Sequence, residues 1–149
     1  MRLRGRYLLL SWSLFVALII AGVPLLLQGY LPDRIAVGWA SSGAAEESSA
    51  LGDYLIGRLA WWSLIVLVWS ALAHRGIPRR NPGKWAGAAL GAFGAVLAGD
   101  VLRVLVANLD VDDYRDVEQL GGAGWVLVAA LVLGWLGWRR AVEPDRGTA

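Results

Sequence analysis

The sequence predicts an all-α integral membrane protein with four transmembrane helices and both termini in the cytoplasm. Four long apolar runs divide the 149 residues, of which 57% are hydrophobic and only 17% are charged. Basic residues collect at one set of boundaries between these runs, and acidic residues collect at the other set. This combination is typical of a polytopic membrane protein, because Lys- and Arg-rich connections remain in the cytoplasm.

Ten of the fourteen basic residues fall on the predicted cytoplasmic side: Arg2, Arg4, Arg6, Arg75, Arg79, Arg80, Lys84, Arg139, Arg140 and Arg146. The outer connections carry the acidic residues Asp33, Glu46, Glu47, Asp53, Asp110, Asp112, Asp113, Asp116 and Glu118. The net charge is only +2 and is divided among short segments. We therefore interpret the basic residues as setting orientation and attracting anionic lipid heads, with no nucleic-acid partner.

The predicted spans cover residues 7–27, 55–73, 85–106 and 122–138. About 20 apolar residues are needed for a helix to cross a hydrocarbon layer of roughly 30 Å. The first run is too long for a signal peptide and lacks a small-residue cleavage site after it, so we expect it to stay attached. Pro24 should kink its outer turn. Residues 139–149 are expected to form a disordered cytoplasmic tail.

Small residues recur every four positions in the third run and would form one ridge of its helix: Gly87, Gly91, Ala95 and Gly99. Close backbone approach at such residues is a main source of packing between helices in lipid. We therefore expect the third helix to be the inner helix of the bundle, with Ala130 and Gly134 of the fourth run as a weaker matching groove. The same ridge could instead serve a homo-oligomer, and its spacing does not choose between the two partners.

Two charges, Asp100 and Arg103, stand inside the third run, and Arg58 lies near the outer end of the second. Counted from Trp85, Asp100 is roughly 22 Å along the helix axis, in the outer third of the hydrocarbon layer. A three-residue separation allows Asp100 and Arg103 to pair. Ionisable groups at this depth either neutralise one another or serve an ion, proton or ligand path; we favour the structural interpretation.

The first outer loop predicts extended structure. Ile35, Val37 and Trp39 alternate with smaller residues, and Ser41-Ser42-Gly43 supplies turn chemistry. A short extended segment or hairpin on the membrane surface is expected.

This loop resembles the domain of unknown function found in small bacterial membrane proteins and in the SdpI-type toxin-immunity proteins. That family carries a Leu-Pro-Asp-x-Ile-Pro-x-His-Trp stretch directly after its first membrane helix, followed by a Gly and an acidic residue. The matching residues here are Leu31, Pro32, Asp33, Ile35, Trp39, Gly43 and Glu46. Ala36 replaces the family's Pro and Gly38 replaces its His. The resemblance covers about residues 7–75 and implies a membrane-embedded immunity or sensing role.

The sequence argues against an enzyme. It has no Cys and a single His, His74, which is predicted on the cytoplasmic side while most carboxylates are outside, so no Ser-His-Asp set can assemble. The acidic stretch over residues 110–118 lacks the central Gly and final Glu of a calcium loop, so a solvated acidic loop is favoured. We expect no catalytic residue, cofactor or metal.

Two functions stay open. The first is a non-enzymatic protein of the bacterial plasma membrane that acts by binding, as an immunity or sensing factor or a small accessory subunit. Its partner would be a secreted peptide or another membrane protein, and its outer recognition surface would contain Asp33, Trp39, Asp112 and Asp113. The alternative is a small transporter or ion-conducting assembly whose polar path is lined by Arg58, Asp100 and Arg103.

Overall fold

The computed structural model describes residues 3–78, 80–118 and 121–140. Its first helix is composite: α1 (Leu3–Ala17) continues through the π-helical turn η1 (Leu18–Gly22), α2 (Val23–Leu27) and the 3₁₀ turn η2 (Gln28–Tyr30). The strands β1 (Ile35–Trp39) and β2 (Ala45–Ser49) follow. The remaining elements are α3 (Leu51–His74), α4 (Pro82–Asn108), the 3₁₀ turn η3 (Tyr114–Asp116) and α5 (Ala123–Arg140).

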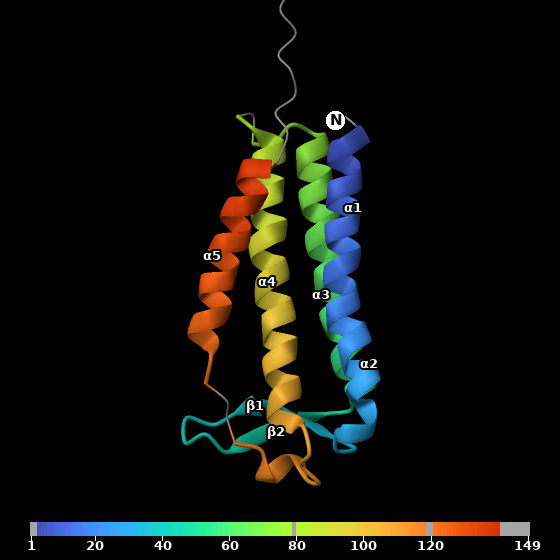
Figure 1. Ribbon diagram of the computed structural model, residues 1–149, viewed down its shortest axis with the longest axis vertical. Coiled ribbons are helices and arrows are strands. Elements are labelled where there is room, and N and C mark those ends of the chain that lie inside the picture. Colours follow the sequence, from blue (N-terminus) through green and yellow to red (C-terminus); the bar gives the residue numbers. More distant parts are fainter. Residues whose placement is uncertain (1–2, 79, 119–120, 141–149) are drawn as a thin grey trace, which may run out of the picture.

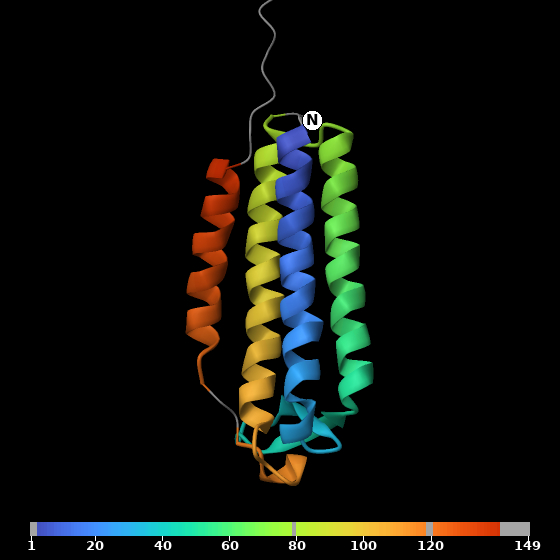
Figure 2. The ribbon, with the colours of Figure 1, turned by 45° about the vertical axis from the view of Figure 1, so that its right-hand side comes forward.

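The long helices stand side by side, with the hairpin and η3 at one end of the bundle (Figure 1). Helix α4 is central, because it lies between α5 on one side and the pair α1 and α3 on the other (Figure 2). Three helices are long and apolar enough to cross a membrane: Leu9–Tyr30, α3 and α4. The prediction of a helical membrane protein is confirmed to this extent. Helix α5 has 18 residues, two of them terminal arginines, so its apolar part is shorter.

The helices reach beyond most of the predicted apolar runs. The composite first helix, α3 and α4 extend past both ends of their runs, whereas α5 begins at Ala123 and continues through Arg140. The expectation of a disordered tail from residue 139 is therefore wrong for Arg139 and Arg140. Cations are favourable in the last turn of a helix, and the Arg139 guanidinium carbon lies 4.1 Å from the Trp135 ring centroid. The rest of that predicted tail, residues 141–149, lies outside the described residues.

Pro24 is accommodated by a change of helix type. It has no backbone N–H, so the carbonyl four residues earlier, that of Ile20, loses its α-helical donor. The π-helical turn η1 contains Ile20 and ends directly before α2, which carries Pro24 in its first turn. A π-helical turn, in which hydrogen bonds span one residue more, therefore stands at the predicted kink.

The predicted hairpin is present. Strands β1 and β2 pair antiparallel, from Ile35 opposite Ser49 to Trp39 opposite Ala45, with irregular register around Gly38. Ile35 is fully buried in the same core as the helices. The hairpin is thus packed onto the end of the bundle.

Three helices meet at Gly94 of α4. A Cβ built there would lie 3.0 Å from Val16 and 3.3 Å from both the Trp12 and Trp62 side chains. The Trp12 indole N–H donates to the Leu90 carbonyl at 3.0 Å, and the Trp62 indole N–H donates to the Ser13 carbonyl at 3.0 Å. In lipid, where water does not compete, such bonds help fix neighbouring helices. They join α1 to both α3 and α4.

Candidate functional site

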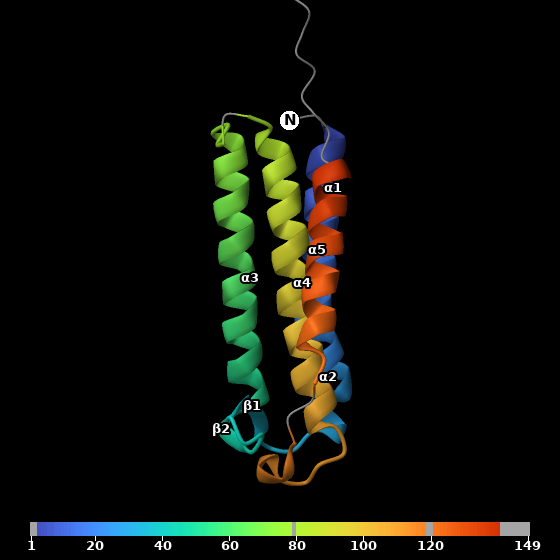
Figure 3. The same cartoon turned by 90° about the vertical axis from the view of Figure 1, so that its left-hand side faces the viewer.

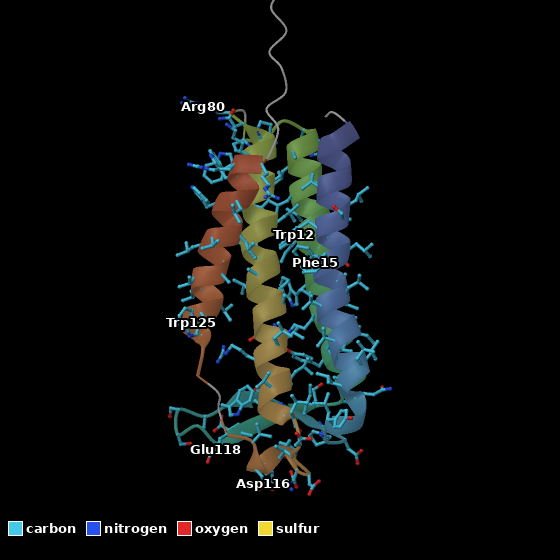
Figure 4. The ribbon with its side chains drawn as sticks, viewed as in Figure 1. Trp12, Phe15, Arg80, Asp116, Glu118 and Trp125 are labelled. Carbon is cyan, nitrogen blue, oxygen red and sulfur yellow. The ribbon has the colours of Figure 1, made fainter. Side chains whose placement is uncertain are left out.

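The end of the bundle that carries the hairpin is acidic. We call it the acidic end, and Asp116 and Glu118 project there, opposite Arg80 at the far end (Figure 4). A depression of about 450 Å³ opens on it, between η2 with its following loop and the loop after α4. It is lined by Gly29, Tyr30, Leu31, Pro32, Asp33, Asp110, Val111 and Asp112. Three carboxylates from two loops therefore border one depression.

The two loops are tied together by backbone. The Asp110 N–H donates to the Tyr30 carbonyl at 3.1 Å. Asp110 adopts a left-handed conformation with φ 57°, which Asp tolerates better than most residues. This turn directs the chain after α4 back toward η2. The two loops that carry the acidic residues of the depression are therefore held against each other.

The depression unites only half of the predicted recognition residues. Asp33 and Asp112 both line it. Asp113 instead caps η3, because its Oδ1 accepts a hydrogen bond from the Arg115 backbone N–H at 2.9 Å. Its Oδ2 lies 3.4 Å from the Arg115 guanidinium. The indole nitrogen of Trp39 is buried and has no hydrogen-bond partner among the described residues. Neither Trp39 nor Asp113 is among the residues that line the depression.

Asn108 holds the hairpin to α4, and the sequence interpretation missed it. Its side chain bonds to both backbone polar groups of Ala36 and donates to the Val104 carbonyl at 2.8 Å. Asn108 is fully buried. The available signal was an amide residue at the end of an apolar run, directly before the acidic loop. Such a residue is also common as a simple helix end, so its position alone did not identify a partner.

The charges within helices α3 and α4 pair across the two helices. Arg58 Nη2 of α3 lies 2.6 Å from Asp100 Oδ2 of α4. Arg103 donates from Nε to the Gly121 carbonyl at 3.3 Å, near the start of α5. The expected pairing was between Asp100 and Arg103 within α4, with Arg58 in a supporting role, whereas in the structure Arg58 forms an ion pair with Asp100. Tertiary packing brings Arg58 to the carboxylate, which sequence spacing within one helix cannot reveal.

Tyr54 lies one helical turn outward from Arg58. Its ring centroid is 5.0 Å from the Arg58 guanidinium carbon, a cation–π distance. The residue is 8% exposed, and its hydroxyl has no hydrogen-bond partner among the described residues. Tyr54, Arg58 and Asp100 therefore form a polar cluster beneath the hairpin.

The small-residue ridge of α4 lies against α5. A Cβ on Gly91 would overlap the Leu133 carbonyl, one on Gly99 would lie 2.8 Å from a Val126 methyl, and one on Gly137 would overlap the Gly87 carbonyl. The buried residues Ala95 of α4 and Ala130 and Gly134 of α5 belong to the same region. The described fold thus uses the ridge within one chain, so a homo-oligomer would need another surface.

Within the described ranges, no three His, Asp or Glu side chains form a group that could hold a metal ion. His74 ends α3 at the opposite end of the bundle from the acidic depression. The geometry offers charge and hydrogen-bond acceptors for binding at the acidic end, and an ion pair inside the bundle.

No family model matches this chain, and neither curated proteins nor solved structures show a match to it. The residues of the motif after the first helix are nevertheless placed in the structure. Asp33 borders the depression, while Ile35, the first residue of β1, is buried in the core that the hairpin shares with the helices. At Gly38, where the SdpI-type motif has His, a Cβ would lie 2.9 Å from the Glu47 carboxylate. Glu47 therefore occupies the space that a side chain at position 38 would need.

Proposed function

We propose that this chain is a non-enzymatic membrane protein with four spans and both termini in the cytoplasm, and that it acts by binding a cationic ligand at its acidic end. The observation that carries the proposal is the depression that joins Asp33 to Asp110 and Asp112. Clustered carboxylates on a rigid outer surface attract cationic partners and speed their encounter. A secreted cationic peptide is the partner class that fits best.

The arrangement of charge supports the orientation. The start of α1, the connection between α3 and α4 and the end of α5 lie together, opposite the hairpin (Figure 1). The described basic residues of this end are Arg4, Arg6, Arg75, Arg80, Lys84, Arg139 and Arg140. Basic connections stay in the cytoplasm, so the acidic end would face outward in the plasma membrane of a bacterium. An immunity or sensing factor of the SdpI type, or a small accessory subunit, would use such an outward surface.

A binding measurement tests the proposal. The full chain is placed in nanodiscs of zwitterionic phosphatidylcholine, and binding of a decalysine peptide is measured at low and high salt. The variant D33N/D112N should weaken binding by at least tenfold and reduce its salt dependence, because two of the bordering charges are removed. The matched variant E46Q/E118Q removes two acidic charges outside the depression and should change binding by less than threefold. If both variants lose the same amount of peptide binding, the binding depends on the general negative charge of the surface and not on the depression.

The Arg58–Asp100 pair favours a second candidate, a small transporter or ion-conducting assembly. An ion pair within transmembrane helices is a default candidate for an ion or proton path. The variant Asp100→Asn separates the two: it should leave peptide binding intact in a binding protein, and should abolish ion flux into liposomes in a transporter. Flux in the wild-type protein that this variant removes, with folding unchanged, would favour the transporter.

A further inference from the structure

One stripe of α4 changes from apolar to charged along its length. Phe93, Val96, Asp100 and Arg103 follow one another at spacings of three and four residues, so they share one face of the helix. Phe93 is 45% exposed and Val96 is 38% exposed, although both lie on the central helix. Helices α3 and α5 flank this helix on opposite sides (Figure 3), so the stripe faces outward between them.

The charged part of the stripe lies near the outer edge of the hydrocarbon layer. Asp100 is eight residues before the end of α4 at Asn108, and Arg58 is seven residues after the start of α3 at Leu51. At 1.5 Å per residue these positions are about 12 Å and 10 Å from the outer helix ends. Helices of 24 and 27 residues exceed a layer of roughly 30 Å. The pair is therefore just below the headgroup level.

At this depth the ion pair needs contact with further polar groups. The side chains of Arg58 and Asp100 are 30% and 34% exposed, and an ion pair that meets acyl chains loses hydration without compensation. A guanidinium carries five N–H donors, and the contact with Asp100 uses the Nη2 group. The Tyr54 ring lies beside the guanidinium, with its centroid 5.0 Å from the Arg58 guanidinium carbon, and its hydroxyl is buried. The cluster is thus rich in donors and suits an oxyanion.

Charge and shape together select the occupant. Arg58 pairs with Asp100, and Arg103 follows Asp100 three residues later on the same face of α4, where its Nε donates to the Gly121 carbonyl. The three side chains together carry one net positive charge. A phosphodiester carries one negative charge and accepts bidentate bonds from Arg. The apolar track over Val96 and Phe93 continues directly inward, where an acyl chain would run. We propose that this stripe binds one outer-leaflet anionic phospholipid, with its phosphate at Arg58 and Arg103 and one acyl chain along Val96 and Phe93.

Native mass spectrometry tests this lipid site. The full chain is released from nanodiscs of equal parts phosphatidylglycerol and phosphatidylcholine, and the retained lipids are identified. The wild-type protein should retain one lipid, with phosphatidylglycerol at least tenfold over phosphatidylcholine. R103Q should reduce this preference to less than threefold. R58Q/D100N should have the same effect, and the double change removes both members of the ion pair so that neither charge is left alone. R115Q, an equivalent change at the acidic end, should have no effect.

Two further variants separate this site from other sources of lipid retention. V96W fills the acyl track while keeping every charge, and should lose the retained lipid. R80Q/K84Q removes charge at the opposite end of the bundle, and should leave the retained lipid in place. Size-exclusion chromatography checks folding, and R103Q and V96W are decisive if R58Q/D100N does not fold. Three results would each overturn the proposal. The first is a wild-type protein that shows no preference between the two lipids, and the second is lipid retention that is unchanged in both R103Q and V96W. The third is a lipid-free dimer that V96W disrupts.

Discussion

The side-chain amide of Asn108 bonds to both backbone polar groups of Ala36: the Ala36 N–H donates to Oδ1 at 2.7 Å, and Nδ2 donates to the Ala36 carbonyl at 3.0 Å. Both residues are fully buried. The Asn108 side chain at the end of α4 therefore gives β1 the pair of hydrogen bonds that a neighbouring strand would provide. This contact sets the position of the hairpin on the helical bundle.

Asn108→Ala should destabilise the protein by roughly 2–5 kcal/mol, because it leaves the N–H and the carbonyl of Ala36 buried without partners. The measurement is the free energy of unfolding in mixed micelles, followed by circular dichroism. Asn108→Asp should also destabilise, since a carboxylate can accept from the N–H but cannot donate to the carbonyl. Gln28→Ala, an exposed amide in η2, is the control and should change stability by less than about 0.5 kcal/mol. Equal stability of the Asn108→Ala variant and wild type would contradict the assigned role.

Gly91→Val should separate α5 from α4, because the added side chain would overlap the backbone at Leu133. Overpacking typically costs about 1–3 kcal/mol, and backbone cannot move aside as a flexible side chain does. The chain has no Cys, so a Cys pair introduced at Ala95 and Ala130 can report helix contact by crosslinking. Crosslinking yield should fall several-fold in the Gly91→Val background. Gly57→Val in α3, where no atom lies within 4 Å of the added Cβ, should leave the yield unchanged.

Adjacent tryptophans should respond differently to loss of the indole N–H. Trp62 is 3% exposed and donates to Ser13 of α1, whereas Trp61 is 61% exposed. Trp62→Phe should cost about 1–2 kcal/mol through the lost interhelical bond and the smaller ring. Trp61→Phe should cost less than about 0.5 kcal/mol. The free energy of unfolding measures both, and similar values would mean that the Trp62 contact contributes nothing.

Single Cys variants should reveal the orientation in cells. Ser42→Cys, in the hairpin turn, and Gly121→Cys, before α5, should react with a membrane-impermeant maleimide in intact cells. His74→Cys and Arg140→Cys should react only after the membrane is permeabilised. This pattern follows from four spans with the acidic end outside. Labelling of Arg140→Cys in intact cells would show that α5 does not cross as proposed.

Much of the fold could be predicted from local properties of the chain. Apolar run length indicated where the helices α3 and α4 form, because a helix in lipid must satisfy its backbone internally. Alternation at Ile35, Val37 and Trp39 indicated the hairpin. The extension of α5 through Arg140 was missed, since two arginines after an apolar run resemble the start of a polar tail, and the stacking of Arg139 on Trp135 is visible only in the structure.

Less of the candidate site could be predicted. Asp33 and Asp112 were singled out separately, but their shared depression depends on the bond between Asp110 and Tyr30 in two distant loops. No distinctive sequence pattern identifies Asn108 as the residue that holds the hairpin, and none identifies Arg58 as the partner of Asp100. Gly94 stands off the four-residue spacing of Gly91, Ala95 and Gly99, because it faces α1 and α3 while that ridge faces α5.

The sequence by itself determined which segments leave water and how charge is sorted along the chain, because both follow from the hydropathy and charge of consecutive residues. Only the tertiary structure decided which groups meet: Asn108 with Ala36, Arg58 with Asp100, and the glycine ridge of α4 with α5. These pairings depend on the rotation and depth of each helix relative to its neighbours. Those quantities are fixed by packing between side chains far apart in the sequence, as Gly94 and Trp62 illustrate.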